Sequence, residues 1–571
     1  MPRFFYCGFR YVKVTASDGS AVNPDDFTAC FLSEDLDQTG DFASSSERLN
    51  LIYEMYLRTQ KSCIIGSVYA GCPGREKVCW TGDASVTKEA VLLSMSDIHG
   101  SEACMELMWN NIQPSGAPIN LMFHTKLDAE DDNWDYAWTS AYFVFPYEVY
   151  MTTGDTYYIE KNYKQMLELF DFYTKVRNTN KEHIKTGRAT DWLGYDNQEH
   201  LVDYSYLDTT YYYYNGKLLS KMMDAIGADH SELDALLDEI YDAIQETFYD
   251  ERGYYHGKTQ TENAMALDLG VVPEEHAEAV LNSLVNACNR ANNTLRTGVL
   301  GTKSLYDALS QANQHKLLLD MTLNPEKCSF GYFLDNGATT FLEHWDVAGE
   351  TFFSHNTPIL AQLDSQNHVM FGGGLATWMY EGLGGITNSG AGYTTSTFRP
   401  GIESELESAR ASVTALVGKL TSDWKMENGD LVWNIEVPAN TTATVIIPMA
   451  SAQSITESGN DVFMKNGDGI TYEGKNESGD FVYTVGGGSY TFVASETPLA
   501  ETDPQDTEPV DTNDADTDVA ETNSAGADTP SDTSAETNAS GGGCASAMGV
   551  STLGVIAAAP VLMKKRTKKK A

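Results

Sequence analysis

Residues 72–83 of this chain read Cys72-Pro73-Gly74-Arg75-Glu76-Lys77-Val78-Cys79-Trp80-Thr81-Gly82-Asp83. A second stretch, residues 337–346, reads Gly337-Ala338-Thr339-Thr340-Phe341-Leu342-Glu343-His344-Trp345-Asp346. Each stretch sets a glutamate beside a basic side chain and follows it with a tryptophan and an aspartate. Hydrolysis of a glycosidic bond needs two carboxyl groups that flank the bond. If the fold brings Glu76 and Glu343 together, the two stretches predict a sugar-cleaving site.

The surroundings of Glu76 do not by themselves favour catalysis. The glycines and the proline just before it place it in a loop ahead of a helix. Arg75 and Lys77 flank its carboxyl, and their positive charges would lower its pKa. A general acid needs the opposite shift, so burial or the carboxylate of Asp83 has to outweigh them. Either glutamate alone is a weak indication, and the prediction depends on both stretches together.

Composition limits the class of protein. The chain has 571 residues, too many for one small core, so at least two domains are expected. Its formal net charge of −43 argues against nucleic acid as a partner. The nine cysteines include no CxxC pair and no spacing typical of metal ligands, so we predict neither a metal site nor a cofactor. The 31 tyrosines and 9 tryptophans fit either stacking surfaces for sugars or aromatic packing between helices.

From about Ser46 to Leu383 the apolar residues recur with a helical period. Helices are predicted near residues 46–60, 85–98, 101–112, 134–152, 156–177, 208–226, 231–248, 260–269, 274–290, 302–312, 313–322 and 355–382. A dozen helices with irregular connections favour a closed ring of helical hairpins, whose inner face gathers residues that are distant in sequence. A solenoid is the alternative, but no fixed repeat period is present.

After Pro400 an alternation with period two replaces the helical period. It is clearest at Leu431, Trp433, Ile435 and Val437. Several short strands up to about Ala494, separated by Gly, Asn and Asp turns, predict an antiparallel β-sandwich beside the helical domain. Residues 1–14 also read as a strand in their second half, without a visible sheet partner.

The C-terminus predicts a membrane anchor. Residues 501–540 are acidic and contain no basic or aromatic residue, which is typical of a disordered, self-repelling stalk. Residues 544–563 are uncharged and long enough to cross a bilayer as a helix of about 30 Å. The basic run 564–570 is then expected on the cytoplasmic side, with everything before residue 540 outside the cell. The alternative is a weakly apolar tail that never inserts.

An exported protein is expected to begin with a signal peptide, and none is visible here. A missing natural start, with signal peptide and leading domains, is therefore predicted. The predicted division is a remnant of a preceding β-domain at 1–45, a helical catalytic domain at 46–395, a β-sandwich at 396–497, a disordered acidic stalk at 498–543, and a transmembrane anchor with a basic tail at 544–571.

The pattern Cys-Pro-x-Arg-Glu-Lys-x-x-Trp-x-Gly-Asp at 72–83 resembles the signature of the α-L-rhamnosidases of glycoside hydrolase family 78. The resemblance continues in order along residues 3–450. Its further members are Phe9-Arg10-Tyr11-Val12, Asp191-Trp192-Leu193, Thr297-Gly298-Val299-Leu300-Gly301-Thr302, Gly337-Ala338-Thr339-Thr340 leading to Glu343-His344-Trp345-Asp346, Asn367-His368, and Val437-Pro438-Ala439-Asn440-Thr441-Thr442-Ala443.

This resemblance implies a mainly α protein, an (α/α)₆ toroid followed by an antiparallel β-sandwich. It implies inverting hydrolysis of terminal α-L-rhamnose, hence a rhamnose-containing carbohydrate as partner. By position, Glu76 resembles the general acid and Glu343 the general base. The residues implied in substrate binding are Arg75, Trp80, Asp83, Asp191, Trp192, His344, Trp345 and His368. Together with the predicted anchor, this indicates a glycosidase of the bacterial cell surface whose oligomeric state stays open.

Three departures from the family pattern leave the sugar open. Gly71 stands where many members have Asp, Trp138-Thr139-Ser140 replaces the usual Trp-x-Asp, and His344 replaces a common Arg. One alternative is therefore an (α/α)₆ glycosidase for another terminal sugar. The other is a catalytically silent glycan-binding surface protein on the same scaffold.

Overall fold

The computed structural model describes residues 12–66, 68–69, 71–73, 77–122, 134–194, 202–345, 365 and 367–499. Met1–Glu501 form one compact unit and Thr502–Ala571 a second. Residues 500–571 lie outside the described residues, and with them the predicted anchor and almost all of the predicted stalk.

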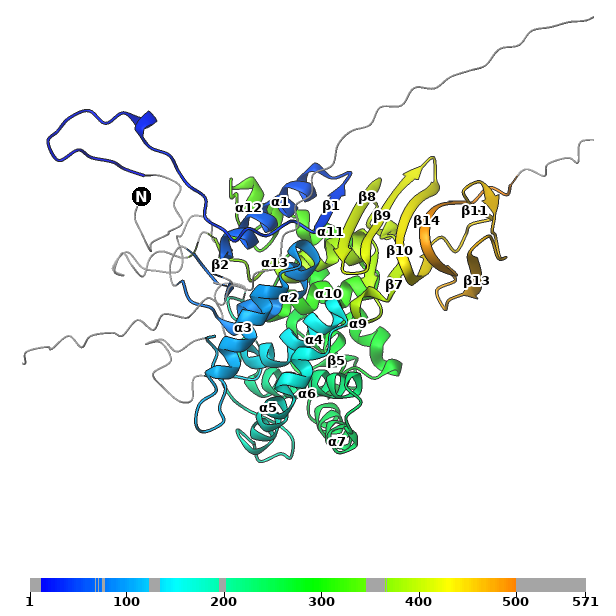
Figure 1. Cartoon of the computed structure of the whole chain (residues 1–571). Coiled ribbons are helices and arrows are strands. Elements are labelled where there is room, and N and C mark those ends of the chain that lie inside the picture. Colours follow the sequence, from blue (N-terminus) through cyan, green and yellow to red (C-terminus); the bar gives the residue numbers. More distant parts are fainter. Residues whose placement is uncertain are drawn as a thin grey trace, which may run out of the picture. The chain divides into compact units, whose positions relative to one another are not determined.

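Helices dominate the first part of the compact unit (Figure 1). Within the described residues they follow one another along the chain as six hairpins. The pairs are α1 (Glu47–Cys63) with α2 (Thr81–Met95), α3 (Ile98–Asn110) with α4 (Ala141–Thr153), α5 (Tyr157–Lys175) with α6 (Tyr204–Ala225), α7 (Ser231–Phe248) with α8 (Gln260–Asp268), α9 (Glu274–Arg290) with α10 (Val299–Gln311), and α11 (His315–Leu323) and α12 (Phe330–Asp335) with α13 (Gly372–Thr377), which continues into the π-helix η6 (Trp378–Leu383).

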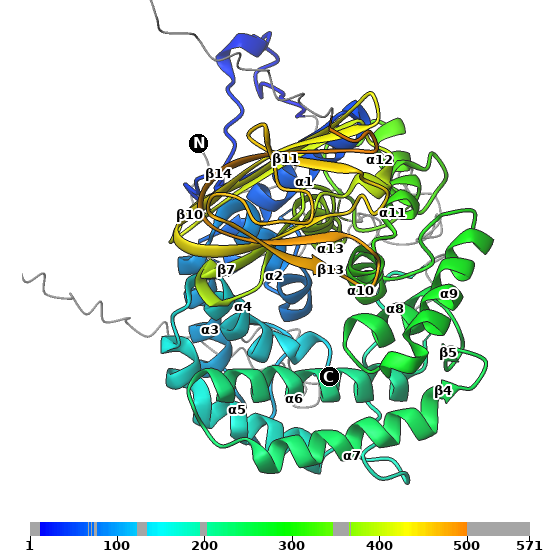
Figure 2. The same cartoon turned by 90° about the vertical axis from the view of Figure 1, so that its right-hand side faces the viewer.

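The second helices of the hairpins close a ring. Helix α2 contacts α4, and the contacts continue through α6, α8, α10 and α13 back to α2. Figure 2 shows the first helices outside this ring, with α7 lying alongside α6. The ring of helical hairpins predicted from the sequence is therefore confirmed, and the solenoid is excluded.

Inner and outer helices differ in sequence because they are buried differently. The outer helix α7 buries one face, with Leu237, Ile240, Ile244 and Phe248 at helical spacing. The inner helix α2 is buried over nearly its whole length, so its sequence shows no apolar stripe. A Cβ on Gly373 of α13 would lie 1.8 Å from the carbonyl oxygen of Val86. The glycine run 372–374 thus allows α13 to approach α2 closely.

In the described part of the chain, β1 and the strands after the ring form one sheet, whose main path has the order β1-β8-β9-β10-β14-β11-β12. All neighbours on this path are antiparallel, β13 pairs with β14, and β7 joins β10 in parallel. The strands are β1 (Gly40–Ser44), β6 (Ile386–Asn388), β7 (Thr395–Phe398), β8 (Ser408–Ala415), β9 (Gly418–Glu427), β10 (Asp430–Ile447), β11 (Ser454–Glu457), β12 (Asn460–Asp461), β13 (Ile470–Lys475) and β14 (Phe481–Ser495). Figure 1 shows β7 to β14 gathered on one side of the helices, as the C-terminal antiparallel domain predicted from the alternation.

Among the described residues the first strand is β1, and it belongs to this sheet. It pairs antiparallel with β8, placing Phe42 opposite Ala411. Residues 12–14, for which a strand was predicted, carry none, and residues 1–11 lie outside the described part. Local alternation could not reveal β1, because its partner is about 370 positions further along the chain.

The sheet packs on the ring through its inner strands. The indole of Trp424 in β9 donates a hydrogen bond of 2.7 Å to the carbonyl oxygen of Leu383, the last residue of η6. Strand β8 also contacts η6. The ring and the sheet therefore share one continuous core.

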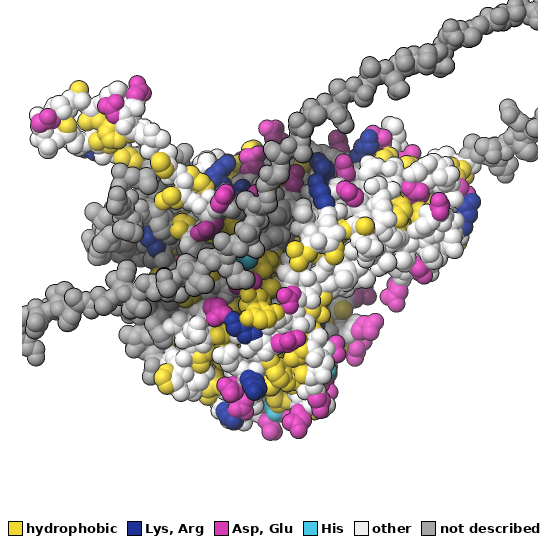
Figure 3. All heavy atoms as spheres, in the orientation of Figure 1, with side chains coloured by type: hydrophobic (Ala, Val, Ile, Leu, Met, Phe, Trp, Pro, Cys, Tyr) yellow, Lys and Arg dark blue, Asp and Glu magenta, His cyan; other side chains and the backbone are white. Residues whose placement is uncertain are grey.

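No helix in the described part of the chain combines the length and apolar character needed to cross a bilayer. The predicted span at residues 544–563 lies outside that part and stays a prediction. Figure 3 shows acidic side chains distributed over the visible face, with basic ones among them, rather than gathered into one patch.

Candidate active site

The loop that carries Glu76 is fixed at its base. The backbone N–H of Gly71 donates to the carbonyl of Val78 (3.1 Å), and that of Lys77 donates to the carbonyl of Cys72 (3.2 Å). The tip of this loop, residues 74–76, lies outside the described residues. The roles predicted for Arg75 and Glu76 therefore stay predictions.

Asp83 follows this loop in the chain and lies close to His368. It lies in the first turn of α2 and is 6% exposed. Its Oδ1 lies 3.5 Å from Nε2 of His368, which is 4% exposed. A Cβ added to Gly71 would lie 3.4 Å from both of these atoms. The fold thus brings Gly71, Asp83 and His368 to one place, and a side chain at position 71 would lie in contact with the pair.

Glu343 is held on the same side of the site as His368. Its carboxylate Oε2 accepts a hydrogen bond of 2.9 Å from the backbone N–H of Ser365, and its own N–H donates to the Ser365 carbonyl at 2.9 Å. The N–H of His368 donates to the carbonyl of Phe341 at 2.9 Å. These bonds align residues 341–343 with 365–368, so that buried Glu343 and His368 belong to one short ladder.

The end of helix α1 anchors this ladder. The hydroxyl of Thr59 accepts from the N–H of Phe341 at 2.8 Å, and the amide of Asn367 donates to the hydroxyl of Ser62 at 2.6 Å. Both segments of the ladder are therefore fixed to the ring, although residues 346–364 between them lie outside the described part.

Trp345 is a packing residue. Its ring is 4% exposed and stacks on Phe333 with centroids 4.8 Å apart, and it also contacts Phe330 and Phe371. Its Nε1 has no hydrogen-bond partner among the described residues. The neighbouring His344 is 5% exposed. Trp345 thus holds its segment against the ring and presents little of its face to a ligand.

Asp191 stabilises the start of helix α10. Its carboxylate accepts hydrogen bonds from the N–H groups of Gly298 (2.7 Å) and Gly301 (2.9 Å) and from the hydroxyl of Thr261 (2.5 Å). Such a cap satisfies donors that a helix start leaves open. Burial raises the pKa of Asp191, and these hydrogen bonds act against that shift. Trp192 beside it stays partly exposed and accepts at its carbonyl from Val299.

Trp80 and Trp138 lie near the start of α2. Trp80 precedes the first residue of the helix and is partly exposed. A Cβ on Gly82 would lie 2.4 Å from the ring of Trp138, so only glycine lets this ring cross the first turn. Ser140 is buried and bonds to Ser85 at 3.1 Å, so it does not replace the carboxylate that the family pattern has there.

Asp135, which no sequence pattern indicated, is a buried carboxylate beside Trp138. It accepts from the N–H groups of Ala137 (3.0 Å) and Trp138 (2.7 Å) and from the amide of Asn120 (2.9 Å). Burial raises its pKa, partly offset by these bonds. Its position three residues before Trp138, just ahead of helix α4, is the sequence feature that could have indicated this carboxylate.

Within the described part of the chain, no group of three or more His, Cys, Asp or Glu side chains is arranged to hold a metal ion.

Residues 37–383 match the sequence profile of the bacterial alpha-L-rhamnosidase 6 hairpin glycosidase domain. This match covers more than half of the chain. The chain belongs to the bacterial α-L-rhamnosidase family. Residues 385–461 match the profile of the bacterial alpha-L-rhamnosidase C-terminal domain, so the α-L-rhamnosidase resemblance extends from the helical ring into the sheet.

Curated proteins that are similar to this chain are themselves named α-L-rhamnosidase. An α-L-rhamnosidase of Formosa agariphila is 26% identical over 477 residues, which cover 80% of this chain and 49% of the relative. One from Alteromonas sp. is 26% identical over 463 residues, covering 78% and 49%. The chain thus spans about half the length of the curated relatives it matches.

Solved α-L-rhamnosidase structures share the fold. The enzyme of Streptomyces avermitilis complexed with L-rhamnose matches with a TM-score of 0.71 at 24% identity, over 80% of this chain and 42% of the other. The enzyme of Dictyoglumus thermophilum matches with a TM-score of 0.71 at 24% identity, over 81% and 51%.

Proposed function

We propose that this chain hydrolyses terminal, non-reducing α-L-rhamnose from glycans or glycosides with inversion at the anomeric carbon. The observation that carries the proposal is the meeting of Asp83 with His368, which joins the Glu76 loop to the ladder that holds Glu343. Family membership and relatives named α-L-rhamnosidase support the choice of sugar.

In the proposed reaction Glu76 donates a proton to the departing glycosidic oxygen. Glu343 takes a proton from the water that attacks the opposite face of the sugar. Inversion requires the two carboxyl groups to lie about 6.5–9.5 Å apart, so that the water fits between them. The hydrogen bond from Ser365 fixes one oxygen of Glu343 and so orients the base.

Asp83 and His368 are proposed to bind the sugar. A carboxylate and an imidazole side by side offer an acceptor and a donor to neighbouring hydroxyl groups, a pattern that suits a polyhydroxylated ring. Arg75, Trp80, Trp192 and His344 complete the proposed binding set, while the contacts of Asp191 and Trp345 give these two a supporting role.

One observation favours the alternative of a different terminal sugar. Gly71 leaves the space beside Asp83 and His368 without the carboxylate that many family members have there. A sugar with another substituent could occupy that space. Activity on other aryl glycosides, with none on the rhamnoside, would establish this alternative.

Release of nitrophenol from an aryl α-L-rhamnoside tests the proposal. Glu76→Gln and Glu343→Gln are each expected to lower kcat by about 10²- to 10⁴-fold, because each removes one proton transfer. Glu168→Gln, the same change on the exposed face of α5, is the matched control and should leave kcat unchanged.

Proton NMR of the first-formed sugar should show the inverted anomer. A retained anomer would contradict the role of Glu343 as a base that activates water. Saturable binding of rhamnosides without turnover would instead establish a catalytically silent glycan-binding protein.

We also propose that the protein acts outside the bacterial cell, held at the surface by residues 544–563. The support is in the sequence: an acidic stalk, an uncharged stretch of bilayer length and a basic end.

A further inference from the structure

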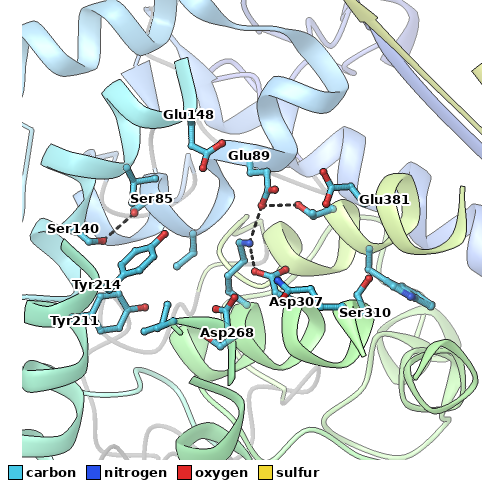
Figure 4. A pocket seen from close by; sticks show the side chains of 18 residues that line it. Ser85, Glu89, Ser140, Glu148, Tyr211, Tyr214, Asp268, Asp307, Ser310 and Glu381 are labelled. Atoms are coloured by element: carbon cyan, nitrogen blue, oxygen red, sulfur yellow. Dashed lines mark hydrogen bonds and ion pairs between the residues drawn. The ribbon is translucent and has the colours of Figure 1, made fainter. Parts of the chain in front are cut away.

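A cavity lies at the centre of the helical ring. It measures about 210 Å³ and is lined from all six inner helices (Figure 4). Asp83, Glu343 and His368 are not among its lining residues. The cavity is therefore lined by side chains that have no role in the proposed reaction, although Ser85 and Ser140 near the start of α2 belong to its wall.

The cavity contains more acidic side chains than it can neutralise. Lys303 of α10 donates to Oε2 of Glu89 at 2.9 Å and also pairs with Asp307 of its own helix. Three further carboxylates line the cavity: Glu148 of α4, Asp268 of α8 and Glu381 of η6. None of these three forms an ion pair with another described residue. Figure 4 shows Glu148, Asp268 and Glu381 entering from different sides.

These three carboxylates are partly buried, and among the described residues only Asp268 has a hydroxyl partner, Ser304, so each loses part of its hydration without gaining a cation of its own. Burial, and after it the carboxylate of Glu89, raises the pKa of Glu148 to about 8. Burial likewise raises the pKa of Asp268 and that of Glu381. The group of acids is therefore either protonated or neutralised by a cation from outside.

Tyr211 is an independent observation that points to a ligand. It is 6% exposed, and its hydroxyl makes no hydrogen bond to a described residue. Figure 4 shows this hydroxyl directed into the cavity, with Tyr214 beside it. This hydroxyl is not among the fully buried polar atoms, so it is reached from the cavity and is available to a ligand there.

We propose that the cavity binds a small aliphatic amine with one or two primary ammonium groups. Each ammonium has three donors, which match Glu148, Asp268, Glu381 and the Tyr211 hydroxyl oxygen. The alkyl chain would lie against the rings of Tyr211 and Tyr214, which also favour a cation over their faces. The volume admits a ligand of a few carbon atoms and is smaller than pockets for larger organic ligands. A metal ion is disfavoured, because these carboxylates do not converge as metal ligands.

Titration calorimetry of the full chain with 1,4-diaminobutane at neutral pH tests the proposal. Saturable binding is expected, with release of protons from the carboxylates and a higher midpoint of thermal unfolding. The neutral 1,4-butanediol, of equal length, should give neither effect. No saturable binding of the diamine, or equal binding of the diol, would overturn the proposal. So would saturation by Mg²⁺ or Ca²⁺ alone.

The variant Glu148→Gln/Glu381→Gln locates the site. It should bind the diamine about tenfold more weakly or worse, because two charged partners are lost. Glu168→Gln on α5 should bind as the unaltered chain does. Hydrolysis of the aryl rhamnoside reports whether the double variant is folded. If an active double variant bound the diamine with unchanged affinity, the diamine would not bind in this cavity, and the proposal would be wrong. If the double variant does not fold, the comparison of diamine with diol decides.

Discussion

At Gly298 the chain touches the backbone of Asp191. This contact explains the glycine at position 298 in the stretch 297–302. A Cβ there would lie 2.2 Å from the carbonyl oxygen of Asp191. The same loop sends the Asp191 carboxylate back to the start of α10. Residue type at 298 is therefore dictated by space and not by catalysis.

Gly298→Ala is expected to destabilise the fold by about 2 kcal/mol or more, because a backbone atom has to move to admit the methyl group. Urea unfolding followed by tryptophan fluorescence measures this. Gly486→Ala in β14 is the matched control, since nothing lies within 4 Å of its added Cβ. Equal effects of the two substitutions would contradict this account of the motif.

Glu148 gives a second prediction, on pH dependence. Its pKa rises from 4.5 to about 8 on folding. Below pH 4.5 both states are protonated and the contribution to stability is complete; it is lost as the pH rises through 8, because the unfolded state ionises first. Glu148→Gln cannot ionise and escapes this loss.

In amine-free buffer Glu148→Gln should match the unaltered chain near pH 4.5. At pH 9 it should be more stable by about 2 kcal/mol or more, since one pKa unit corresponds to about 1.4 kcal/mol. Urea unfolding at the two pH values gives the comparison. A stability difference that is the same at both would show that Glu148 titrates normally.

At the scale of elements, the clearest patterns were those of helices with one buried face. Helices α7 and α9 begin and end where their periodicity predicted. The inner helices α2, α6 and α10 begin three or four residues earlier than predicted. Burial on all sides removes the stripe that marks a boundary, so their ends depend on the loops that cap them. The six-residue α12 was missed because it is too short to show a period.

Strand β1 was not predicted either, and its packing in the sheet can be tested. Phe42 is 4% exposed and its ring packs 5.7 Å from that of Tyr53. Phe42→Ala should cost about 3 kcal/mol, the usual cost of a buried phenylalanine. Urea unfolding measures it, with Leu51→Ala on the exposed face of α1 as control. A cost near that of the control would mean that β1 does not pack as described.

For the whole molecule, the division of the chain into Met1–Glu501 and Thr502–Ala571 predicts that the first unit folds without the second. A chain ending at Leu499 should unfold within about 2 °C of the full chain, because it keeps the entire described core. Differential scanning calorimetry checks this.

The same pair of chains tests the proposed anchor. The full chain should co-sediment with liposomes that contain anionic lipid, and the chain ending at Leu499 should stay in the supernatant. Equal partitioning of both would contradict an anchor at residues 544–563.

The ring of helices, the sheet after it and the membership of the family could all be predicted from patterns in the sequence. Helical and alternating periods are local properties, and motif residues keep their spacing whatever they contact. The contact of Asp83 with His368, the pairing of β1 with β8 and the capping of α10 by Asp191 could be seen only in the folded chain. The same is true of the carboxylates that share one cavity. Contacts between distant residues leave no local period, and acidic side chains from different helices come together only once the ring has closed.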